Sequence, residues 1–129
     1  MSKDTQNTFI QRIKETEPLF YADFKIKHKK IAVDGLVTRI SYSFGRGIVE
    51  FLLGPPEYHV EIFISTINVD GNFDRYDLAK LMSISRLRTW IINNKPDINC
   101  NDKIKAEIDW YVLLLKEIKG LDKFRSLST

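Results

Sequence analysis

The chain has 129 residues, of which 43% are hydrophobic and 29% charged, and its net charge at pH 7 is +3. This length and composition predict one folded domain over residues 1–129 and exclude a disordered chain. A charge excess this small is not that of a dedicated nucleic-acid-binding protein, which gathers basic residues on one face. No apolar run reaches the roughly 20 residues of a membrane helix.

Cysteine content and the first residues bear on the cellular compartment. Cys100 is the only cysteine, so no disulfide can form within the chain. The opening residues contain no apolar stretch typical of a secretory signal. We therefore expect a cytoplasmic protein, and no motif in the sequence points to a bound cofactor.

The first predicted element is an amphipathic helix over residues 5–17, where apolar residues recur at helical spacing. Pro18 either ends this helix or opens a further turn through Phe20 and Tyr21, because proline disfavours helix in the residue before it.

The middle of the chain is rich in β-branched and aromatic residues in short runs between turn signals. Asp34-Gly35 favours a tight hairpin, because glycine adopts positive φ at little cost. "FGRG", residues 44–47, is also predicted as a hairpin turn, because it lacks the lysine and hydroxyl residue of a phosphate-binding loop. Four antiparallel strands are expected, at about residues 24–33, 36–44, 48–53 and 58–67.

After the strands the apolar period changes to about 3.6 residues. Asp74 is a plausible N-cap, and the pattern that follows predicts one helix interrupted near Ser83, or two helices with a tight bend. The strongest helix signal is the apolar stripe from Ile104 to Ile118, which Gly120 is placed to end. The predicted fold class is α+β, an antiparallel meander of about four strands with the helices packed mainly on one face.

One strand carries a candidate metal or acid/base site. Glu57, His59 and Glu61 fall on one side of an extended strand, but its two glutamates would be about 13 Å apart. A site would therefore need a ligand from a neighbouring strand, for which Glu50 is the candidate. The alternative is a half-exposed strand face with cross-strand charge pairs, for example to Arg39.

Two surface features are also candidates. The basic run "KIKHKK", Lys25 to Lys30, is typical of a solvated strand or loop. Phe63, joined by Phe51, is expected to point away from the core, which predicts an apolar patch and dimerisation through the sheet.

Residues 78–94, "LAKLMSISRLRTWIINN", resemble the helix-turn-helix segment of bacterial DNA-binding proteins. Ser83 falls at the turn, where glycine is usual, and Ile84 opens the counterpart of the recognition helix. The resemblance implies that Arg86 and Arg88 contact bases or phosphates in the major groove. It departs from the pattern in having a sheet before it instead of a helical domain.

The whole order of elements resembles small bacterial α+β proteins of unassigned function, some of them similar to immunity proteins, which neutralise a toxin by binding it. This resemblance covers most of the chain and carries over no functional residue. It implies a non-enzymatic protein-binding module, with a protein partner or a second copy as ligand. A DNA-binding regulator is the alternative, and a metal-dependent or acid/base enzyme using Glu57, His59 and Glu61 is the third hypothesis.

Overall fold

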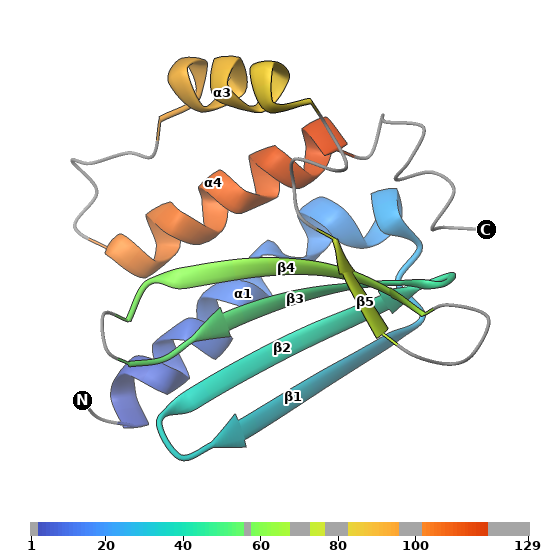
Figure 1. The fold of residues 1–129 in the computed structure, drawn as a ribbon. Helices are drawn as coiled ribbons and strands as arrows, with labels where there is room; N and C mark the ends of the chain where they lie inside the picture. Colours follow the sequence, from blue (N-terminus) through green and yellow to red (C-terminus); the bar gives the residue numbers. More distant parts are fainter. Residues whose placement is uncertain (1–2, 56–57, 68–72, 77–82, 96–101, 119–129) are drawn as a thin grey trace.

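The structure is a computed structural model that describes residues 3–55, 58–67, 73–76, 83–95 and 102–118. In these residues one long helix is followed by five strands and then by two helices (Figure 1). The elements are α1 (Lys3–Phe24), β1 (His28–Asp34), β2 (Val37–Phe44), β3 (Gly47–Leu53), β4 (Val60–Ile67), β5 (Phe73–Tyr76), α3 (Ile84–Asn93) and α4 (Lys103–Ile118).

The strands form one antiparallel sheet in the order β1-β2-β3-β4-β5, so each strand pairs with its neighbour in the sequence. Asp34 pairs with Val37, which leaves Gly35 at φ 61° as the first loop residue of the β1–β2 hairpin. Gly45 plays the same part in the β2–β3 hairpin, at φ 52°. Tight hairpins of this kind need positive φ, which glycine adopts without strain. Both predicted hairpin turns are confirmed.

Helices α1 and α4 lie on one face of the sheet, and α3 lies on the outer side of α4, away from the strands (Figure 1). The predicted α+β class with an antiparallel meander and one helix-covered face is confirmed. None of the described helices combines the length and the apolar character needed to cross a lipid bilayer. The hydrophobic core contains Phe9, Ile13, Phe20, Phe24, Ile40, Tyr42, Phe44, Val49, Phe51, Leu53, Val60, Ile64, Trp90, Ile108, Val112, Leu114, Leu115 and Ile118.

Helix α1 continues through Pro18 to Phe24. Of the two predicted alternatives, the further turn through Phe20 and Tyr21 is therefore confirmed. Proline costs one backbone hydrogen bond, but the turns beyond it bury Phe20 and Phe24 against aromatic side chains of the sheet. Lys25, at φ 51°, then turns the chain toward β1, and its N–H donates to the Tyr21 carbonyl. Phe24 therefore ends a helix, and its expected place at the start of a strand is wrong.

The segment after β4 also departs from the prediction. Asp74 lies in β5 and pairs with Thr66 of β4, so its expected role as a helix N-cap is wrong. A helix does begin after Ser83, since Ser83 is extended and its side chain accepts a hydrogen bond from the Arg86 N–H at the start of α3. Residues 77–82 and Gly120 lie outside the described residues.

Candidate functional site

The face of the sheet opposite α1 and α4 carries no described helix (Figure 1). A groove of about 580 Å³ lies on it, spanning four neighbouring strands from β1 to β4. Charged and hydroxyl side chains dominate its walls. The lining residues are His28, Lys30, Arg39, Ser41, Ser43, Ile48, Glu50 and Ser65.

Strand alternation and register place these side chains together. In β2, Ser41 lies between the buried residues Ile40 and Tyr42, and successive side chains of a strand point to opposite faces. Ser41 pairs with Lys30 on one side and with Glu50 on the other, so these three form a row across the sheet. Neighbours in such a row are about 5 Å apart.

The groove combines cations with one carboxylate. Lys30 and Arg39 are exposed and Glu50 is half-buried, and no ion pair within the described residues involves any of the three. Lysine and arginine donate to carboxylates or phosphates, while Glu50 accepts from an amide or a cation. The arrangement can therefore hold a polar ligand that brings acidic groups together with some donors.

His59 and Glu61 do not share one strand face as predicted. Tyr58 has φ 54°, so the chain is not extended there and strand alternation begins only at Val60. His59 instead contacts a carboxylate oxygen of Glu107 in α4 at 3.4 Å, and the other oxygen accepts from the Val60 N–H at 2.6 Å. Glu61 is exposed and pairs with Leu52 of β3.

Glu50, the proposed companion of His59, lies in the groove and shares it with a different histidine, His28. The expectation that Glu50 completes a site with His59 is therefore wrong, because His59 turns toward α4. Glu57 lies outside the described residues, and within them no group of three or more His, Cys, Asp or Glu residues could hold a metal ion.

Of the two phenylalanines expected to form an apolar patch on the outer face, only Phe63 lies there. Phe51 is fully buried and pairs with Ile40 and Ile62 in the core, so its expected place on the outer face is wrong. Phe63 pairs with Glu50 on the open face and is half-buried. Neighbouring residues of β3 point to opposite faces, so Glu50 lies on the open face and Phe51 cannot lie there with it.

The candidate nucleic-acid residues lie on α3. Arg86 and Arg88 are both exposed, and Arg86 donates to Glu117 of α4 at 2.8 Å. A second hollow of about 500 Å³ lies beside this ion pair and is lined by Ser83, Ser85, Arg86, Thr89, Trp90, Asn93, Asn94 and Glu117.

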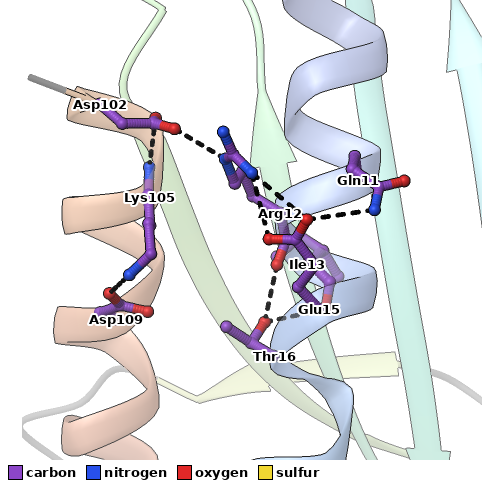
Figure 2. A network of polar contacts seen from close by, with 8 residues as sticks. All are labelled: Gln11, Arg12, Ile13, Glu15, Thr16, Asp102, Lys105 and Asp109. Atoms are coloured by element: carbon purple, nitrogen blue, oxygen red, sulfur yellow. Dashed lines mark hydrogen bonds and ion pairs between the residues drawn. The ribbon is translucent and has the colours of Figure 1, made fainter.

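On the helix-covered side, a polar network joins α1 to the start of α4 (Figure 2). Arg12 donates to Asp102 at 2.7 Å and also pairs with Glu15. Asp102 accepts a hydrogen bond from the Lys105 N–H at 3.0 Å, which makes it the N-cap of α4. This backbone hydrogen bond, together with Arg12, lowers the pKa of Asp102 below its ordinary value.

A second polar contact ties α1 to the sheet. The Tyr42 hydroxyl donates to Glu17 at 2.7 Å, and Lys29 of β1 pairs with the same carboxylate. Burial, followed by the neighbouring Glu17, raises the pKa of Tyr42. Both networks stabilise the packing of α1, and neither opens into the groove.

Sequence reasoning did not identify the groove, although part of its signal is visible in the sequence. Serines alternate with apolar residues in "ISYSF", residues 40–44, which is the pattern of a strand with one polar face. The basic run at residues 25–30 supplies His28 and Lys30. What the sequence does not contain is the register that sets Lys30, Ser41 and Glu50 in one row.

Searches against protein-family models, curated proteins and solved structures found no match for this chain.

Proposed function

We propose that this protein is a non-enzymatic binding module that holds a partner protein on the open face of its sheet. The observation that carries the proposal is the groove, in which Lys30, Arg39 and Glu50 have no ion pair among the described residues. Charged groups on a concave face are suited to a partner of complementary charge. An immunity-type inhibitor is the form of this function that the sequence resemblance suggests.

Half-buried apolar side chains around the groove add to this support. Ile48, Leu52 and Phe63 lie on the open face between the charged residues. Protein interfaces commonly combine an apolar centre with a polar rim and form about one hydrogen bond per 100–200 Å² of interface area. A partner protein meets both requirements, and so does a second copy of this chain.

The test is affinity capture with three versions of the chain. The groove variant carries Lys30→Glu and Arg39→Glu, and the matched control carries Lys14→Glu and Lys116→Glu. The control residues are exposed on α1 and α4, so both variants change the net charge equally. We expect the wild type and the control to retain the same partner and the groove variant to lose it. Equal capture by all three would overturn the proposal.

DNA binding through α3 is a second candidate, favoured by one observation. Ser83 caps α3, so the helix begins at Ile84, where the helix-turn-helix resemblance places the recognition helix. Arg88 is exposed on it, although Arg86 is engaged by Glu117. This function predicts binding that weakens steeply with salt and is lost on Arg88→Ala but not on Lys116→Ala. Absence of binding to duplex DNA at low salt would exclude it.

A further inference from the structure

The two edges of the sheet differ. The β5 edge is only 4 residues long, whereas β1 has 7 residues, all of them paired with β2. Every residue of β1 except Ala32 is exposed, and within the described residues the strand has a neighbour on one side only. Along its outer edge every second residue presents a backbone N–H and C=O that no described strand pairs with, which is a template for an added strand.

The side chains of β1 would contact such a strand on both faces of the sheet. Toward the helices, Ile31 is 44% and Val33 is 55% exposed, so apolar surface is available beside the edge. Toward the groove lie His28 and Lys30. An added strand would therefore need apolar residues on one side and polar residues on the other, in alternation.

Arg39 also comes within reach of the edge. It pairs with Ala32 of β1, whose short side chain leaves the space above β1 open at this position. A strand added beside β1 would lie about 10 Å from β2, since neighbouring strands are about 4.8 Å apart. An arginine and a glutamate side chain extended toward each other span that separation.

Charge decides what kind of strand fits. Residues 25–30 carry Lys25, Lys27, Lys29 and Lys30, of which Lys29 is paired with Glu17, and Asp34 is the only acidic residue of β1. A second copy of β1 would bring the same lysines to the same edge, which like-charge repulsion disfavours. An acidic segment would be attracted to it.

We propose that an extended acidic segment of the partner protein adds to the sheet as a strand beside β1. Its apolar side chains pack against Ile31 and Val33, and its carboxylates lie toward Lys30 and Arg39. This inference rests on the proposed function, since it names the partner chemistry that the open face binds.

The test uses synthetic seven-residue peptides of alternating valine and glutamate, with binding followed by the backbone amide signals of the protein in NMR. Two further peptides carry N-methyl groups at the odd or at the even positions, which removes hydrogen-bond donors on one edge without changing charge. A valine-lysine peptide is the charge control. Size-exclusion chromatography of the protein alone reports self-association.

We expect the acidic peptide to shift the β1 signals, and one N-methylated peptide to bind at least tenfold more weakly than the other. Lys30→Glu should weaken binding at least tenfold, while Lys14→Glu should leave it unchanged. Equal binding of both N-methylated peptides, shifts outside β1 and β2, binding of the lysine peptide, or a homodimer through β1 would each overturn the inference.

The experiments distinguish failure of the proposed binding function from failure of strand addition. If capture of the partner depends on the groove but both N-methylated peptides bind equally, the binding function stands and strand addition is wrong. If the peptide binds β1 but the groove variant still captures the same partner, the open face is not the functional surface.

Discussion

The two faces of the sheet are built from alternate residues of the same strands, and they differ in burial and in polarity. Ile40 and Tyr42 of β2 are fully buried under the helices, while Ser41 between them lines the groove with Glu50 of β3. Burial of apolar surface stabilises the fold, so the covered face should carry most of the stability. The open face, which carries no described helix, should contribute less to it. Substitutions at neighbouring positions should therefore differ sharply in their effect.

The largest difference is expected between two phenylalanines. Phe51→Ala should lower the free energy of unfolding by about 3 to 5 kcal/mol, because Phe51 is fully buried and a cavity would remain. Phe63→Ala on the open face should cost about 1 kcal/mol. Urea denaturation measures both, and equal costs would show that the open face is part of the stabilising core.

Tyr42→Phe should cost about 1.5 kcal/mol, because it removes the hydrogen bond to the Glu17 carboxylate. The effect should also depend on pH. The pKa of Tyr42 is raised in the folded state, whereas an unfolded tyrosine titrates near 10. Its contribution is therefore present below about pH 10 and is lost as the pH rises further.

Urea denaturation midpoints measured at pH 8 and at pH 10.5 test whether the contribution of Tyr42 to stability falls as the pH rises. The wild type should lose more stability between the two pH values than Tyr42→Phe does. The variant should still lose some stability as the pH rises, since burial also raises the pKa of Tyr21 and Tyr111. Parallel losses in both proteins would contradict the assignment to Tyr42.

Asp102→Ala should cost about 1 kcal/mol, because it removes the N-cap of α4 and the contact to Arg12 on α1. Asp109→Ala is the matched control; it removes only an exposed pair with Lys105 and should cost about 0.5 kcal/mol or less. The pKa of Asp102 is lowered in the folded state. The difference in free energy of unfolding between wild type and Asp102→Ala should therefore be largest above about pH 4 and should decrease as the pH falls below it.

The smallest effect on stability is expected in the groove. Lys30→Ala combined with Arg39→Ala should change the free energy of unfolding by less than about 0.5 kcal/mol, because both side chains are exposed and form no ion pair among the described residues. The same variant should lose the captured partner. A large loss of stability would mean that these cations support the fold and are not reserved for a ligand.

Much of the fold could be predicted, because its signals are local. The apolar stripe of α4 is confirmed, with Ile108, Val112, Leu115 and Ile118 buried. The hairpins follow from glycine at Gly35 and Gly45. The candidate site was predicted less well, since its members come from four strands and meet only through register.

The sequence by itself determined the types of most elements, β5 excepted, together with the meander and the packing face of α4, because periodicity and turn chemistry act over a few residues. Tertiary structure decided the rest. It carried α1 through Pro18 by burying Phe20 and Phe24, and it turned Phe51 inward. It also directed His59 to Glu107 through the left-handed Tyr58 and set Lys30, Ser41 and Glu50 in one row across the sheet. Each of these outcomes depends on contacts between segments far apart in the chain, where burial outweighs local preference.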